Sequence, residues 1–209
     1  MHLQLEYAIL TMEAIFCNQK KRGILIMLNV LFIGNSHTFC NEVPALFCDL
    51  AASDGFECHA VMLAHGGWTL GQHAKEPDVF YNLRKGHYDY VIFQEHTHPF
   101  NLDGKMVPAC TQMAAWGREC GTVPVIFGTW AQKWEREKQQ EIDDGCLEAA
   151  KAADALPVLV GNAWWASIDA NPELELYAAD GGHATPAGSA IAARELWNTI
   201  SAHWKARSN

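Results

Sequence analysis

The stretch Val30-Leu31-Phe32-Ile33-Gly34-Asn35-Ser36 places four apolar residues directly before a Gly-Asn-Ser turn. A short apolar run that ends in such a turn is typical of a buried strand in an α/β protein. We therefore predict the first core strand over residues 28–33, with Ser36 just beyond its carboxyl end. A serine at a strand-to-helix turn exposes its hydroxyl, so Ser36 is either a nucleophile or a simple helix N-cap.

Apolar runs alternate with helix-like segments along the rest of the chain, a pattern that indicates an α/β sheet. No repeat or linker interrupts it, so residues 27–209 are expected to form a single domain. Asn41 is a plausible N-cap of the helix that follows Ser36. The further strands are expected at residues 58–63, 90–93, 123–127 and 157–160, and the helices at 42–52, 70–85, 109–120, 134–155 and 186–203.

Residues 1–26 fall outside this pattern. Lys20-Lys21-Arg22 and the apolar residues after them resemble the start of a signal peptide, but cleavage there would remove the first strand. The apolar stretch is also too short to span a bilayer. The segment is therefore expected to be an added N-terminal helix, or the product of a start codon assigned too early. Of the two we favour the second, with Met27 as the true start.

Composition limits the classes of function. A length of 209 residues suits one domain with a sizeable core, and a net charge of -9 argues against nucleic acid or an anionic membrane surface as partner. The seven cysteines are odd in number and include no Cys-x-x-Cys pair, which predicts reduced thiols in a cytoplasmic protein and no zinc site.

Four polar clusters follow the predicted strands. They contain Ser36, the pair Gly66-Gly67, the tripeptide Gln94-Glu95-His96, and the pair Asp180 and His183. Because the carboxyl ends of parallel strands lie at one edge of a sheet, we expect these clusters to converge there.

The segment Asp180-Gly181-Gly182-His183 supplies the most specific chemistry. An imidazole can shuttle a proton at physiological pH, and a carboxylate three residues earlier can reach it within one turn and orient it. Together with Ser36, these residues provide the nucleophile, base and orienting acid of a serine hydrolase. His37, next to Ser36, points in a different direction and is not expected to be the base.

The other clusters suggest supporting roles. A glycine N–H at Gly67, or at Gly66, can approach a developing negative charge, and the Gln94 amide could donate to the same oxyanion. Glu95 and His96 could touch substrate or support the residues that do. Trp130 could line a pocket or pack in the core, and His98 is expected to be an ordinary loop histidine.

These motifs resemble the four blocks of the SGNH (GDSL-like) hydrolase superfamily, over residues 30–190. Gly34-Asn35-Ser36 is similar to the first block, with Asn where Asp is usual, and Gly67-Trp68-Thr69 to the second, with Trp68 in place of Asp. Asp180 and His183 match the last block. The third block departs, because Gln94-Glu95-His96-Thr97 lacks the usual Asn; Gln94 or His96 would then complete the oxyanion hole.

The resemblance implies a flavodoxin-like three-layer sandwich with a five-stranded parallel sheet. It also implies an ester hydrolase that uses neither metal nor cofactor and acts through an acyl-enzyme. Ser36 would attack, His183 would move the proton, Asp180 would hold His183, and the N–H groups of Ser36 and Gly67 would bind the oxyanion with Gln94. A small-molecule ester, such as an acylated sugar or a short acyl ester, is the expected substrate, with no stable membrane anchor; the oligomeric state is left open.

Three alternatives stay open. A metal-dependent hydrolase could use Glu95, His96, His98, Asp180 and His183 as ligands, although no His-Glu-x-x-His signature is present. A carbohydrate- or acyl-binding module could have kept the fold and lost the chemistry, as the irregular third block suggests. A flavodoxin-like nucleotide or redox protein could bind phosphate at residues 34–38, which would leave Asp180 and His183 without a role.

Overall fold

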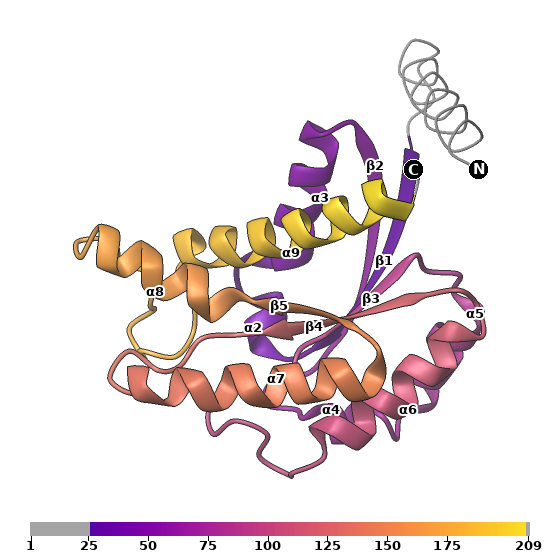
Figure 1. Ribbon diagram of the computed structural model, residues 1–209, viewed down its shortest axis with the longest axis horizontal. Helices are drawn as coiled ribbons and strands as arrows, with labels where there is room; N and C mark the ends of the chain where they lie inside the picture. The colour runs from indigo at the N-terminus through magenta and orange to yellow at the C-terminus, as the bar shows by residue number, and fades with distance from the viewer. Residues whose placement is uncertain (1–25, 208–209) are drawn as a thin grey trace, which may run out of the picture.

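The computed structural model describes residues 26–207, which form a five-stranded sheet in which every neighbouring pair is parallel (Figure 1). The strand order is β2-β1-β3-β4-β5. The chain direction across the sheet reverses between β1 and β3, which is where open α/β sheets bind ligands. The strands are β1 (Ile26–Gly34), β2 (Phe56–Ala64), β3 (Tyr90–Phe93), β4 (Val123–Gly128) and β5 (Leu156–Leu159).

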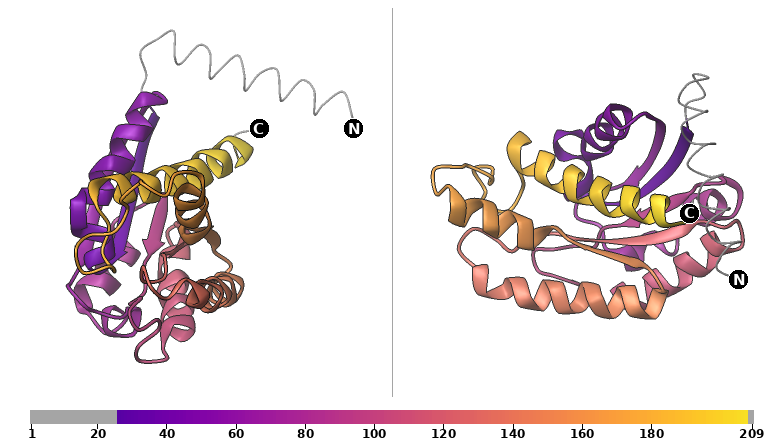
Figure 2. Two further views of the ribbon diagram at one scale, coloured as in Figure 1. Left: turned by 90° about the vertical axis from the view of Figure 1, so that its left-hand side faces the viewer. Right: turned by 45° about the horizontal axis from the view of Figure 1, so that its top comes forward.

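Helices cover both faces of the sheet and make three layers (Figures 1 and 2). One face carries α3 (Val43–Ser53), α8 (Val160–Ala170) and α9 (Pro186–Arg207). The other carries α4 (Leu70–His73), α5 (Pro77–Lys85), α6 (Met106–Arg118) and α7 (Gln139–Ala153). The three-layer α/β sandwich with a five-stranded parallel sheet is thus confirmed. Over residues 26–207, no helix combines the length and apolarity needed to cross a membrane.

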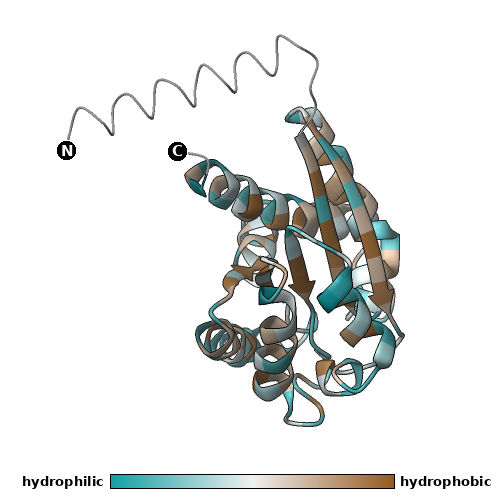
Figure 3. Ribbon diagram, turned by 90° about the vertical axis from the view of Figure 1, so that its right-hand side faces the viewer, coloured by the Kyte–Doolittle hydropathy of each residue, from teal (hydrophilic) through white to brown (hydrophobic). Residues whose placement is uncertain are grey.

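The core lies along the central strands. All four residues of β3 are buried, and so are five of the six in β4, whereas the edge strand β2 exposes several side chains. Figure 3 shows the apolar colour concentrated on the strands. Continuous apolar runs suit strands that are covered on both faces. This rigid sheet holds the loops at its carboxyl edge.

Two expectations about element limits are corrected. Strand β1 begins at Ile26, and its first two residues pair with Phe56 and Glu57, so residue 26 belongs to the sheet and not to an extension over residues 1–26. The rest of that predicted extension lies outside the described residues.

The helix expected over residues 70–85 is two helices, α4 and α5, because Pro77 opens α5 and has no N–H to continue the helix before it.

Asn41 is not the N-cap of α3. Asn41 and Glu42 both adopt positive φ angles, of 55° and 58°, and the cap position falls on Glu42. The Asn41 side chain instead donates from Nδ2 to the carbonyl of Ala184 at 2.9 Å and to Ser189 Oγ at 3.0 Å. It therefore ties the segment after Ser36 to the segment after His183.

Candidate active site

Ser36, His183 and Asp180 form a continuous hydrogen-bonded chain. Ser36 is the first residue of the short helix α2 (Ser36–Phe39), directly after β1. Its Oγ lies 2.7 Å from His183 Nε2, although the two residues are 147 positions apart. His183 Nδ1 lies 2.5 Å from Asp180 Oδ2. The side chains of His183 and Asp180 are 36% and 52% exposed, so a small molecule can reach them from solvent.

The second oxygen of Asp180 is also bonded. Asp180 Oδ1 accepts the backbone N–H groups of Gly182 and His183, both at 3.0 Å. The His183 hydrogen bond and these two N–H groups hold the pKa of Asp180 well below its usual range. A carboxylate in this place favours the tautomer with the proton on His183 Nδ1, which leaves Nε2 free to accept from the Ser36 hydroxyl.

The loop that carries Asp180 and His183 is clamped to the loop after β4. The carbonyl of Gly181 accepts from the backbone N–H of Lys133 at 2.9 Å, and that of Gly182 accepts from Trp130 Nε1 at 2.9 Å. Gly181 has a φ of 66°, and a Cβ there would overlap the Trp134 ring. Only glycine allows this approach.

The Gly34-Asn35 turn positions Ser36. Asn35 caps α2, because its Oδ1 accepts from the backbone N–H of His37 at 3.1 Å. Its Nδ2 donates to the Trp68 carbonyl at 3.0 Å. A Cβ at Gly34 would lie 2.5 Å from Thr38 Oγ1 and 2.7 Å from Gln94 Oε1, so no larger residue fits at the end of β1.

The loop of Gly66 and Gly67 lies against this turn through the bond between Asn35 and Trp68. Both glycines are exposed. Gly67 has a φ of 73°, and no heavy atom lies within 4 Å of the place a Cβ would take. A Cβ at Gly66 would lie 3.9 Å from the Phe39 ring. The backbone at Gly67 is thus open to a bound molecule on the side where its Cβ would be.

Gln94 has a different place from the one predicted. Its side chain is fully buried, and its Oε1 accepts from the Asn35 backbone N–H and from Thr38 Oγ1, both at 2.9 Å. Its Nε2 donates to the carbonyl of Glu95. An oxyanion donor must face the substrate, so of the two expected candidates for the third donor, Gln94 and His96, the buried Gln94 does not fit that role. Gln94 instead supports the Ser36 turn from inside the protein.

The two residues after Gln94 differ in exposure. Glu95 is 3% exposed and accepts from the backbone N–H groups of Leu70 and His96, which ties the end of β3 to the start of α4. Burial raises the pKa of Glu95 to about 7, against the opposite effect of these N–H groups. Glu95 therefore supports the site and does not face substrate. His96 is only partly buried, and its Nδ1 lies 2.8 Å from the Pro99 carbonyl.

Trp130 is part of the core. It is fully buried and stacks on Trp164 with ring centroids 3.9 Å apart and planes at 4°. Of the two roles expected for Trp130, pocket lining and core packing, the structure shows core packing, because the stack covers the indole and its N–H donates to the Gly182 carbonyl.

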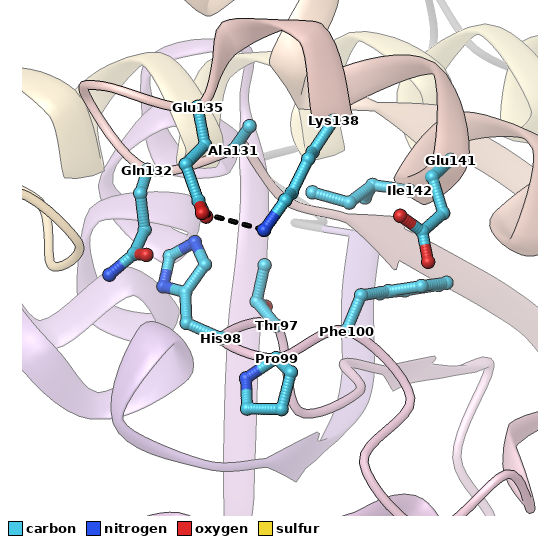
Figure 4. Close-up of a pocket in the computed structure, with 10 residues that line it drawn as sticks. All are labelled: Thr97, His98, Pro99, Phe100, Ala131, Gln132, Glu135, Lys138, Glu141 and Ile142. Atoms are coloured by element: carbon cyan, nitrogen blue, oxygen red, sulfur yellow. Dashed lines mark hydrogen bonds and ion pairs between the residues drawn. The ribbon is translucent and has the colours of Figure 1, made fainter.

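His98 lies in the loop after β3, and its side chain has a specific place there. It lines a cavity of about 380 Å³ between the loops after β3 and β4 (Figure 4). Its ring also lies edge-on to His37, with ring centroids 5.2 Å apart. The cavity has a polar wall with an ion pair between Glu135 and Lys138 at 2.6 Å. In the sequence, only their place after a predicted strand end marks the cavity residues of these two loops as candidates for the site. That place in the sequence does not show that the two loops face each other. The remaining lining residues include Pro99, Phe100, Gln132, Glu141 and Ile142.

In the part of the chain that the structure describes, no group of three or more His, Cys, Asp or Glu side chains is arranged to hold a metal ion. Asp180 and His183 are bonded to each other and to Ser36, and Glu95 is buried against backbone N–H groups. The ligand set of the metal-dependent alternative is therefore not assembled in these residues.

Of three comparisons with known proteins, only the one with solved structures finds matches, and these have the same fold. No family model matches the sequence, and no curated protein matches it. Among solved structures, a candidate SGNH hydrolase from Slackia heliotrinireducens is 28% identical, with a TM-score of 0.66 over 83% of this chain and 99% of the other.

Two more distant structures have the same fold. A carbohydrate esterase family 3 protein from Talaromyces cellulolyticus is 15% identical, with a TM-score of 0.66 over 86% of this chain and 99% of the other. The esterase EstA from a Pseudoalteromonas species is 10% identical, with a TM-score of 0.63 over 85% and 98%. The resemblance drawn from the sequence motifs is confirmed: this chain has the fold of the SGNH, or GDSL-like, hydrolase superfamily.

Proposed function

We propose that this protein is a serine-dependent ester hydrolase that cleaves small carboxylic esters through an acyl-enzyme. The observation that carries the proposal is the chain from Ser36 Oγ to His183 Nε2 at 2.7 Å and from His183 Nδ1 to Asp180 Oδ2 at 2.5 Å. This is the arrangement in which a hydroxyl, a base and an orienting carboxylate act together. Esterases among the structures of similar fold support the reaction class.

In the acylation step, Ser36 Oγ attacks the ester carbonyl carbon while its proton passes to His183 Nε2. The tetrahedral intermediate carries its negative charge on the former carbonyl oxygen. When the C–O bond to the alcohol breaks, His183 returns the proton to the leaving alcohol. Asp180 keeps the ring in place and stabilises the imidazolium in between.

Deacylation repeats the same proton movements with water. His183 accepts a proton from the attacking water, and Ser36 regains it as the carboxylic acid leaves. The backbone N–H groups of Ser36 and Gly67 are the proposed oxyanion donors, with Gly66 as the near alternative. The open backbone of Gly67 and its contact with the Ser36 turn through Trp68 favour this assignment.

The proposed substrate is small and partly polar, an acylated sugar or a short acyl ester. The cavity of about 380 Å³ beside His98 has the size of one such group, and Glu135, Lys138 and Gln132 offer it hydrogen bonds. Two structures of similar fold are of an acetyl esterase and a carbohydrate esterase. We propose the cytoplasm as location because the seven cysteines are odd in number and include no Cys-x-x-Cys pair, a usage that indicates reduced thiols.

Covalent labelling with a fluorophosphonate, followed by peptide mapping, tests the proposal. We expect one modified residue, Ser36, and loss of p-nitrophenyl acetate hydrolysis in step with labelling. Ser36→Ala should abolish both, while Ser53→Ala, an exposed serine on α3, should change neither. Activity that survives in Ser36→Ala but is lost with a chelator would favour the metal-dependent alternative. Wild-type protein that neither labels nor exceeds Ser36→Ala in hydrolysis would favour the binding module.

A further inference from the structure

His37 is a buried histidine that the proposed reaction does not use. Its side chain is 8% exposed. Its Nδ1 has a long contact of 3.4 Å with Asn35 Oδ1, its Nε2 makes no hydrogen bond of good geometry among the described residues, and the ring interacts with the backbone of Gly182. Its hydrogen bonds are therefore weak, and ring contacts dominate its surroundings.

The ring of His37 lies between the proposed base and an aromatic cluster. It stacks on His183 with centroids 5.0 Å apart and planes at 25°. On its other sides it contacts His98 edge-on at 5.2 Å and Trp130 at 5.5 Å. One face of the His183 imidazole is therefore covered, while its partner Asp180 approaches in the ring plane.

The charge of His37 is compatible with this contact. Burial, followed by the neighbouring His98 and His183, lowers the pKa of His37 to about 3; His96 acts in the same direction, and the backbone of Gly182 acts against them. His37 is thus neutral near pH 7. A neutral ring face can stack on an imidazolium, whereas a second cation would repel it.

Resting on the proposed function, we propose that His37 is a positioning residue for His183. Its ring forms a wall that keeps His183 Nε2 directed at Ser36 Oγ. His183 needs this contact because its side chain is 36% exposed, which leaves room for rotamers that would turn Nε2 away from Ser36. His37 also excludes water from one face of the His183 ring during proton transfer.

The test compares His37→Phe, which keeps a flat ring, with His37→Leu, which keeps apolar volume without one. We expect kcat of His37→Leu to fall about 3- to 10-fold with KM unchanged, the range that one aromatic contact represents. His37→Phe should stay within about twofold of wild type because it retains the stack. His59→Leu, on the exposed face of edge strand β2, is the control and should match wild type. Equal kcat in the two His37 variants, with both folded by thermal melting, would overturn the proposal.

A second measurement does not depend on turnover. The proton shared by His183 Nδ1 and Asp180 should give a downfield NMR resonance in wild type, and Asp180→Asn identifies it. We expect this resonance to persist in His37→Phe and to broaden in His37→Leu, as His183 leaves its position. If it is equally sharp in both variants, His37 does not position the ring, whatever reaction the protein performs. Absent fluorophosphonate labelling together with this NMR difference would reject the esterase function and keep the positioning role.

Discussion

Asn35 Nδ2 donates to the backbone carbonyl of Trp68 at 3.0 Å, and this bond joins the turn before Ser36 to the loop of Gly66 and Gly67. A carboxylate could not make the bond, because it has no hydrogen to donate. The bond gives a physical reason for Asn at a position where the resembling family usually has Asp. It adds to the backbone bond from the His65 N–H to the Gly34 carbonyl at 3.2 Å, so a side-chain amide and a backbone bond together hold the proposed oxyanion loop against the turn of the proposed nucleophile.

Asn35→Asp tests this relationship. Asn35 is 2% exposed, and one oxygen of the new carboxylate could still accept from the His37 N–H, but the other would face the Trp68 carbonyl oxygen with no hydrogen between them. We expect a loss of about 1–3 kcal/mol in the free energy of unfolding and a clear fall in kcat. The control is Asn82→Asp on α5, whose Nδ2 donates to the carbonyl of Asp78 at 2.9 Å in an exposed place. Thermal melting and ester hydrolysis measure both; equal effects of the two changes would contradict the prediction.

Asp180→Asn should leave the protein folded and nearly inactive. The new side-chain oxygen can still accept from the N–H groups of Gly182 and His183, but its NH₂ group would face His183 Nδ1. The ring is then driven to the wrong tautomer, and kcat should fall about 10²- to 10⁴-fold. Asp169→Asn, which removes an exposed ion pair with Arg136, is the control and should retain full activity. Steady-state kinetics of wild type and both variants measure kcat. A kcat of Asp180→Asn equal to that of wild type would exclude the proposed role of Asp180.

Gly181→Ala should move the loop that carries His183. Its φ of 66° strains any other residue, and the added methyl group meets the Trp134 ring. We expect kcat to fall about 10- to 100-fold, because small misplacements of catalytic groups are costly. Gly104→Ala shares the backbone strain, with a φ of 65°, but has open space around its Cβ. It should lower the melting temperature slightly and leave kcat unchanged; a similar loss of kcat in both variants would show that strain alone matters.

Glu95 predicts a pH dependence of stability. Its pKa is raised from 4.5 to about 7 in the folded protein, mainly by burial. An acid whose folded pKa is raised binds its proton more tightly when folded, so the stabilising effect is complete below pH 4.5 and is lost as pH rises through about 7. Wild type should therefore lose about 2–3 kcal/mol relative to Glu95→Gln between pH 5 and pH 8.

Melting curves of wild type and Glu95→Gln across this range measure the difference. The glutamine also changes the bonds to Leu70 and His96, which adds an offset that is the same at every pH. Glu57→Gln on the exposed face of β2 is the control, with no such trend expected. Parallel curves for wild type and Glu95→Gln would show that Glu95 does not titrate in this range.

Local sequence predicts the strands well and the roles of polar side chains poorly. Strand β3 occupies residues 90–93 as expected, because a short apolar run between polar residues can only be buried. Gln94 was expected to face substrate and lies inside, because the Asn35 N–H and the Thr38 hydroxyl both need an acceptor there. Asn41 was expected to cap a helix and bonds instead to Ala184 and Ser189, more than a hundred residues away. Such partners cannot be read from neighbours in the chain.

By itself, the sequence determined the alternation of strands and helices, the placement of polar clusters after strand ends, and the candidates Ser36, Asp180 and His183. These follow from local periodicity and from spacing within one turn. Only the tertiary structure decided that Ser36 meets His183, that Gln94 and Trp130 are enclosed, and that His37 stacks on the base. The physical reason is that burial and long-range contacts depend on the spatial order of the parallel strands in the sheet. This order brings together loops that are far apart in the chain.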